Sequence, residues 1–240
     1  MARAKATRGL CVYCGKEYTR WGMTKHLQSC PQRAEQTGQA ADAGKAVPIF
    51  HLLVQDAYGG DFWLHLEMPG QTTLQELDGY LRAIWLECCG HLSAFEFDGT
   101  RYTQIIEGFD TWGNEASMDV PVAQVFAPGV QGSHEYDFGS TTELALEVVA
   151  ERTGVWSGKP IALMARNAPP DLKCNVCDKA AEWICIDCMY EADEADGVDD
   201  WFFCEEHLLE HEHEDEMALP VVNSPRMGTC GYDGPAEPPY

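Results

Sequence analysis

The sequence predicts an α+β fold, a mostly antiparallel sheet with one main helix, flanked by two small cysteine-rich modules. Residues 47–168 contain several apolar runs of strand length and one segment with helical spacing, whereas Cys-x2-Cys pairs occur only outside that region. A small polar stretch and a Pro-Pro pair mark the boundaries. We therefore expect a first module at 9–31, a flexible linker at 32–46, an α+β domain at 47–168, a second module at 171–232 and a tail at 233–240.

Strands are expected where apolar residues run together or alternate. An Asp-Gly pair between two such runs predicts a tight hairpin at SAFEFDGTRYTQ (93–104). Residues 105–131 have little pattern and several glycines, which favours a surface loop. The other predicted strands are IFHLLVQ (49–55), DFWLHLEM (61–68), EYDFGS (135–140), TELALEVVAER (142–152) and the buried KPIALMARN (159–167).

The main helix is expected at residues 73–87. Thr73 and Glu76 have the spacing of a capping box, in which each side chain accepts a hydrogen bond from the other residue's backbone N–H. Gly90 is placed to end the helix. The apolar residues that recur at helical spacing are Leu74, Leu77, Leu81, Ile84 and Trp85.

The first module contains Cys11-x2-Cys14-x11-His26-x3-Cys30. A Cys-x2-Cys pair places two thiols on one tight turn, and His26 and Cys30 share one face of a helix. Together they predict a closed tetrahedral zinc site, and the segment resembles a classical ββα zinc finger with Cys30 as the last ligand. Four protein ligands leave no position for a reacting water, so we expect a structural role.

The second module is denser in the same residue types. Two zinc ions in an interleaved arrangement of the B-box or RING kind fit it best, which brings the expected total to about three. The pairing of upstream with downstream ligands stays open. Helical spacing places Cys204, His207 and His211 on one face and turns His213 away. The predicted ligands are Cys174, Cys177, Cys185, Cys188, Cys204, His207 and His211, with His213 and Cys230 as further candidates.

Charge is distributed unevenly along the chain. The net charge is −23, but residues 1–33 carry +6 and residues 174–216 carry −15. We expect the acids to form a solvated face rather than a metal store. The negative net charge disfavours a protein that wraps nucleic acid or binds an anionic membrane over a large surface. No apolar run approaches the length of a membrane span. The start lacks an apolar leader, so we expect cytoplasmic localisation and thiols that bind metal rather than disulfides.

The basic first module is the place where nucleic acid could bind. Lys16, Arg20 and Lys25 are the candidate contacts, since they lie on or beside the expected finger helix. A single finger covers only about three base pairs, which is too few for specificity by itself.

The middle domain resembles a known family. The runs LDGYLRAIWLECCGHLSAFEFDG and HEYDFGSTTELALEVV, followed by a Cys-x2-Cys pair shortly after ARNAPP, are similar to the plasmid pRiA4b ORF-3-like family. The best marks are YDFG at 136–139 and the helix that leads into GHL at 90–92. The resemblance implies an α+β domain, often fused to zinc-binding segments, and no catalytic residues. The sequence departs from the family at 140–142, where STT stands instead of an Asp-x-Trp pattern.

Catalytic motifs are absent from the sequence: no nucleophile elbow, phosphate-binding loop, dinucleotide fingerprint or His-Glu-x-x-His occurs. Cys88, Cys89 and His91 could form a nucleophile or hold a metal. We favour a helix end with buried cysteines, because adjacent cysteines do not easily share one tetrahedral site with His91. In the strand near residue 135, alternation separates His134 from Asp137, which we expect to bind backbone donors in the next turn.

These observations favour a zinc-binding, non-enzymatic interaction or adaptor protein with a protein partner and no membrane contact. A nucleic-acid-binding accessory protein that acts through residues 1–33 is the alternative. An enzyme of the middle domain is the third hypothesis, and it depends on an open metal position near Cys88, Cys89 or His91.

Overall fold

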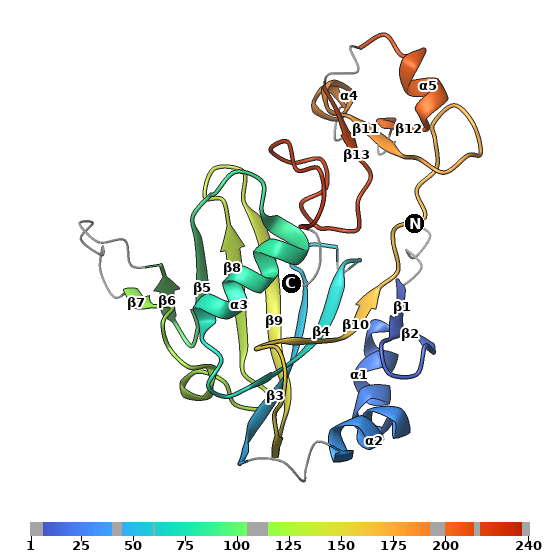
Figure 1. Cartoon of the computed structure of the whole chain (residues 1–240). Coiled ribbons are helices and arrows are strands. Elements are labelled where there is room, and N and C mark those ends of the chain that lie inside the picture. Colours follow the sequence, from blue (N-terminus) through green and yellow to red (C-terminus); the bar gives the residue numbers. More distant parts are fainter. Residues whose placement is uncertain are drawn as a thin grey trace. The chain divides into compact units, whose positions relative to one another are not determined.

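The computed structural model describes residues 7–39, 45–59, 61–104, 115–192, 200–213 and 217–236. The chain forms two compact units (Figure 1). The first comprises Met1–Arg82 and His91–Ala168, and the second comprises Ala83–Gly90 and Pro169–Tyr240. The predicted linker residues 40–44, loop residues 105–114, acidic residues 193–199 and 214–216, and tail residues 237–240 lie outside the described part of the chain.

The first unit is built on a ten-stranded sheet in the order β2-β1-β10-β4-β3-β9-β8-β5-β6-β7. Neighbouring strands are antiparallel except β6 and β7, which are parallel. The predicted α+β class with a large, mostly antiparallel sheet is therefore confirmed. The strands are β1 (Arg8–Cys11), β2 (Glu17–Thr19), β3 (Ala46–Asp56), β4 (Trp63–Pro69), β5 (Ser93–Phe97), β6 (Thr100–Thr103), β7 (Glu115–Ser117), β8 (Gln131–Tyr136), β9 (Thr142–Val155) and β10 (Ala162–Asn167).

The predicted strands of the middle region form close to where the sequence placed them. The Asp98-Gly99 turn joins β5 to β6 with both residues at positive φ, as a tight hairpin requires. The strand expected at 135–140 instead ends at Tyr136, because Asp137 turns into the left-handed region with φ of 66°. Every residue of β4 is buried, so this central strand is covered on both faces.

Helix α3 (Leu74–Leu81) lies across one face of the sheet (Figure 1). The predicted capping box is present, with Thr73 accepting from the Glu76 N–H and Glu76 accepting from the Thr73 N–H. The expected helix continues only as a π-helical turn, Arg82–Leu86. The described chain also contains α1 (Arg20–Ser29) and α2 (Pro31–Gln39), both longer than α3, so the prediction of one main helix is not confirmed.

The first module is not a separate body. Strand β1 pairs with β10, so the finger's hairpin extends the main sheet. Met23 and Leu27 of α1 are fully buried in one core cluster with Leu53 and Trp63 of the sheet. The flexible linker expected from residue 32 also differs, because residues 31–39 form α2. Helix α2 is polar, and Arg33 attaches it to α1 by donating a hydrogen bond to the backbone oxygen of Leu27 at 2.6 Å.

The second unit has a small three-stranded sheet in the order β12-β11-β13. Its strands are β11 (Trp183–Cys185), β12 (Phe202–Phe203) and β13 (Ala218–Pro220), and its helices are α4 (Ile186–Glu191) and α5 (Glu205–Leu209). Residues 83–90 belong to this unit through the C-terminal segment. Ser224 Oγ donates to the backbone oxygen of Trp85 at 2.6 Å, and the Ala236 N–H donates to that of Ala83 at 2.9 Å. No described helix is long and apolar enough to cross a membrane.

Candidate metal centres

The four predicted ligands of the first module converge. Cys11 ends β1, Cys14 follows in the turn, and His26 and Cys30 come from α1 and its C-terminal cap. Their ligand atoms all lie within 4.8 Å of one another, and Cys14 Sγ is 3.2 Å from His26 Nε2. Bond lengths of about 2.3 Å to sulfur and 2.0 Å to nitrogen separate such atoms by about 3.5 Å around a tetrahedral zinc. The group therefore fits one ion.

Two local features hold this group in place. Gly15 adopts a left-handed φ of 66° in the turn after Cys14, which a residue with a side chain would rarely adopt. Thr19 caps α1 by accepting from the Gly22 N–H, and Tyr18 stacks on the His26 ring with centroids 4.3 Å apart. The turn thus fixes the positions of the thiols, and the stacking on Tyr18 orients the imidazole of His26.

Thiol acidity differs within the finger. Burial raises the pKa of Cys11 to about 11. Burial also opposes ionisation of Cys14, but hydrogen bonds from the Lys16 backbone and from the side chains of Cys11 and Cys30 lower its pKa below the ordinary value. A bound dication removes this conflict, because it lets all the thiols ionise together.

The second unit contains two further groups of four. The first consists of Cys174, Cys177, Cys204 and His207. His207 Nδ1 is 3.4 Å from Cys174 Sγ and 3.2 Å from Cys204 Sγ, and the sulfurs of Cys177 and Cys204 are 4.0 Å apart. Burial would raise the pKa of Cys174, but backbone N–H groups, that of Cys204 foremost, lower it to about 6. This site favours a thiolate, which is the form that binds metal.

The other group of the second unit consists of Cys185, Cys188, His211 and His213. His211 Nε2 lies 3.0 Å from Cys188 Sγ, and His213 Nδ1 lies 3.3 Å from Cys185 Sγ. The two groups interleave along the chain, so Cys174 and Cys177 lie close to Cys204 and His207, whereas Cys185 and Cys188 lie close to His211 and His213.

Two details of that prediction are wrong. His211 does not share a site with Cys204 and His207, and His213 does not point away from the ligands. Both expectations assumed one continuous helix, whereas α5 ends at Leu209. After the helix ends, His211 and His213 can both turn toward the Cys185–Cys188 knuckle.

A further group in the second unit comprises Cys88, Cys89 and Cys230, whereas His91, which the sequence grouped with Cys88 and Cys89, belongs to the first unit. The sequence favoured buried cysteines at a helix end, but Cys89 and Cys230 are exposed and Cys88 is half-buried. The four groups together include all eleven cysteines of the chain. Cys230 was predicted only as an extra ligand for the C-terminal cluster. No spacing signal connects it with Cys89, 141 residues earlier.

The candidate nucleic-acid contacts are arranged less favourably. Lys16 and Lys25 are exposed, but Arg20 is half-buried, and its guanidinium lies 5.2 Å from the centre of the Trp21 ring. Two other basic residues of this segment bind acids of the chain: Arg8 pairs with Glu17 and Arg33 with buried Glu67. Part of the local positive charge is thus neutralised within the fold.

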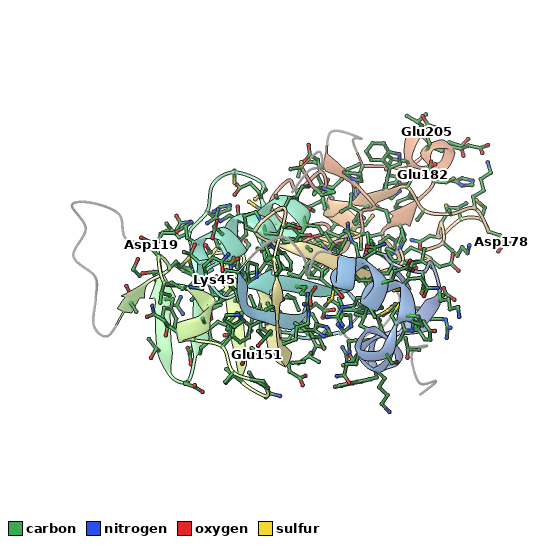
Figure 2. All side chains as sticks on the ribbon, turned by 60° about the horizontal axis from the view of Figure 1, so that its bottom comes forward. Lys45, Asp119, Glu151, Asp178, Glu182 and Glu205 are labelled. Atoms are coloured by element: carbon green, nitrogen blue, oxygen red, sulfur yellow. The ribbon has the colours of Figure 1, made fainter. Side chains whose placement is uncertain are left out.

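Acidic side chains surround the metal groups of the second unit. Figure 2 labels Asp178, Glu182 and Glu205, all exposed, on the elements that carry the ligands. Glu206 pairs with Lys179, the single base of the acidic segment. Glu191 lies beside a ligand group, with its Oε2 atom 3.7 Å from His213 Nε2.

The buried polar pairs of the first unit are structural in character. His134 Nε2 lies 2.8 Å from Asp78 Oδ1, and Asp78 also accepts from Arg82 at 2.7 Å and Gln104 at 3.1 Å. Asp78 was not singled out by the sequence, because it sits on a helix distant in the chain. Asp137 accepts from the Gly139 N–H at 3.0 Å, as expected.

Comparisons with known proteins add little. No protein-family model matches the chain, and none of the curated proteins matches it. Among solved structures it is similar to the crystal structure of a protein of unknown function, MM3350 from Methanosarcina mazei Go1. The identity is 15%, the match covers 50% of this chain and 69% of that one, and the TM-score is 0.43.

Proposed function

We propose that the chain is a zinc-stabilised interaction protein rather than an enzyme, with one zinc ion in the finger group and two in the interleaved groups of the second unit. The observation that carries this proposal is the convergence of three complete sets of four sulfur and nitrogen ligands. Soft thiolate and imidazole donors in sets of four are typical of structural zinc. Each set is full, so it has no position left for a substrate or a reacting water.

Zinc content after single substitutions tests the metal part. Cys14→Ser, Cys174→Ser and Cys188→Ser each remove one ligand from one group, so each protein should lose one zinc relative to the unsubstituted chain. Lys16→Ser is the control and should lose none. Native mass spectrometry of protein purified without a histidine tag counts the ions. Unchanged zinc content in all three cysteine variants would refute the proposal.

The partner is proposed to be a protein that binds the second unit. Exposed apolar side chains occur there among many acids: Val176 is 61% exposed at the tip of a cysteine knuckle, and Leu209 is 71% exposed at the end of α5. A partner with an apolar patch rimmed by basic residues complements such a surface.

Pull-down from the native host, with the full chain as bait, tests this surface. Val176→Asp and Leu209→Asp should each lose a partner that the unsubstituted chain retains after nuclease treatment. Leu10→Asp, at a position 56% exposed on β1, is the matched control and should keep it. Retention by both second-unit variants together with loss by the control would move the interface to the finger.

The alternative function, nucleic-acid binding through residues 1–33, rests on the exposed Lys16 and Lys25. It predicts capture that is abolished by nuclease and insensitive to Val176→Asp. The same experiment therefore separates the two functions.

We also propose that residues 47–168 form a pRiA4b ORF-3-like domain. The YDFG motif supports this assignment in physical terms, since Asp137 takes a left-handed turn and binds the Gly139 N–H. An experimental structure of a family member should show the same turn at its motif, and a different backbone there would count against the assignment.

A further inference from the structure

We propose that Cys88, Cys89 and Cys230, all three in the second unit, bind a fourth zinc ion. This site extends the zinc function proposed above to residues that carried no metal prediction as a set. The three sulfur atoms all lie within 4.8 Å of one another.

The sulfur geometry fits a metal better than a disulfide. Cys88 Sγ lies 3.6 Å from Cys89 Sγ, and Cys89 Sγ lies 3.8 Å from Cys230 Sγ. Sulfurs at about 2.3 Å from one tetrahedral ion lie about 3.8 Å apart, whereas a disulfide requires about 2.05 Å. Both observed separations match the edge of a zinc tetrahedron.

Adjacent cysteines can share this site because the backbone bends between helix and strand. The π-helical turn ends at Leu86, and Gly90 has a left-handed φ of 78°. Cys88 and Cys89 thus lie in an irregular bend, where consecutive side chains are not forced to diverge as they are on a helix. The helix geometry that argued against a shared site does not apply here.

Cys230 is held in place by its own turn. It has a left-handed φ of 51°, between Gly228 at 77° and Gly231 at 67°. A residue with a side chain in this region is uncommon and is typical of functional sites, where surrounding structure enforces it. The hydrogen bond from Ser224 to the Trp85 backbone fixes this segment beside the bend that carries Cys88.

Charge balance supports the same ion. Three thiolates and one zinc ion carry a net charge of −1, and Arg226 is fully buried with its Nη2 atom 3.4 Å from Cys88 Sγ. A guanidinium that donates to a thiolate stabilises its charged form.

The exposure of two of the thiols also favours a metal site over apolar packing. Free cysteines that pack as apolar residues are among the most buried residues in proteins, yet Cys89 and Cys230 are exposed. In a metal site such thiols are protected by coordination instead of by burial.

Native mass spectrometry under a reductant that does not bind metal tests the site in the full chain. We expect four zinc ions per chain, and three in both Cys89→Ser and Cys230→Ser. Thr229→Ser, next to Cys230 and without a ligand atom in the group, should keep four. Three ions in the unsubstituted chain, unchanged in both serine variants, would overturn the fourth site and leave the proposed function intact. If the unsubstituted chain contained no zinc in the finger group and in the two interleaved groups, the proposed function would be refuted instead.

Thiol titration gives a readout that does not depend on counting ions. In the folded, reduced chain no thiol should react rapidly with a thiol reagent, and chelation should release all eleven. Rapid reaction of two or three thiols before chelation, mapped to Cys89 and Cys230 by peptide analysis, would show that the site holds no zinc.

Discussion

At the scale of single residues, the first unit depends on a buried carboxylate that no motif marks. Glu67 of β4 is only 3% exposed and accepts from Arg33 at 2.6 Å and from Arg152 at 2.7 Å. It connects α2 and β9 to the centre of the sheet. Burial would raise the pKa of Glu67, but the hydrogen bonds and charges of Arg152 and Arg33 outweigh it and lower the pKa.

Glu67→Gln should therefore destabilise the first unit. Removing one partner of a fully buried ion pair typically costs about 3 to 5 kcal/mol, and we expect a loss of about 3 kcal/mol or less here, because the side chains of Arg33 and Arg152 are only half-buried. Urea unfolding at neutral pH measures this loss. Glu96→Gln, on the exposed position of β5, is the control and should change the free energy of unfolding by less than about 0.5 kcal/mol.

The same residue makes a pH prediction. The pKa of Glu67 is lower in the folded state, so its ionisation stabilises the fold fully above the unfolded value of about 4.3. That contribution disappears as the pH falls through the folded-state pKa. The difference in stability between the unsubstituted chain and Glu67→Gln should shrink in acid, and a difference that grew below pH 4 would contradict this account. Acid should release metal from both proteins alike, so the difference between their free energies of unfolding at each pH is not affected by that release.

At the scale of elements, helix α3 shows what local sequence determines. Its capping box is a short-range pattern, and the structure contains it as predicted. Thr73→Ala should lower the free energy of unfolding by about 1 kcal/mol through loss of the cap. Gln75→Ala, exposed in the same turn, should have little effect. Equal effects of the two substitutions in a denaturation experiment would show that the cap contributes nothing.

The finger shows what local sequence does not determine. Its four ligands follow from spacing alone, but its docking depends on β1 pairing with β10, more than 150 residues later. The sequence contains only weak signals of this docking, such as the apolar residues Met23 and Leu27. Both are buried in the structure, but they would also fit the small core of an isolated finger. Helix α2 was missed for a similar reason, since its polar sequence is typical of a linker and Arg33 holds it through a tertiary ion pair.

Cys14→Ser should consequently destabilise the whole first unit. An isolated finger would unfold alone, whereas this one shares its core with Leu53 and Trp63. We expect loss of one zinc and a fall of several degrees in the main thermal transition, measured by calorimetry. Lys16→Ser, exposed and two residues away, should leave the transition in place. An unchanged main transition with one zinc lost would mean that the finger folds independently of the sheet.

At the scale of the whole molecule, the charge distribution limits any contact with nucleic acid. Among the described residues 7–33, acids of the chain bind Arg8 and Arg33, while Lys16 and Lys25 are exposed. With so few contacts, binding should be micromolar or weaker at physiological salt and should fall steeply as salt rises. Lys16→Glu together with Lys25→Glu should abolish it, whereas Lys45→Glu, labelled in Figure 2, should not. Anisotropy of a labelled duplex at two salt concentrations measures this, and tight binding that survives high salt would overturn it.

The metal ligands also differ in whether their partners are close or distant in the sequence. Cysteine knuckles are complete within four residues, so every one was found from spacing. The partners of the two C-terminal knuckles were left open because nothing in the spacing selects them, and helical extrapolation past Leu209 misplaced His211 and His213. The fourth group was missed because Cys89 and Cys230 meet only in the folded chain. Sequence spacing thus identifies a metal site when both ligand pairs are local.

The return of the C-terminal segment to residues 83–90 has a consequence for synthesis. Trp85 and Leu86, fully buried in the folded chain, emerge from the ribosome about 140 residues before Ser224, which binds the Trp85 backbone. At roughly 5 to 20 residues per second, that interval lasts on the order of ten seconds. Throughout it the nascent chain has an apolar stretch beside two unligated thiols. We expect this stretch to need shielding from other apolar surfaces until residues 222–236 have been synthesised.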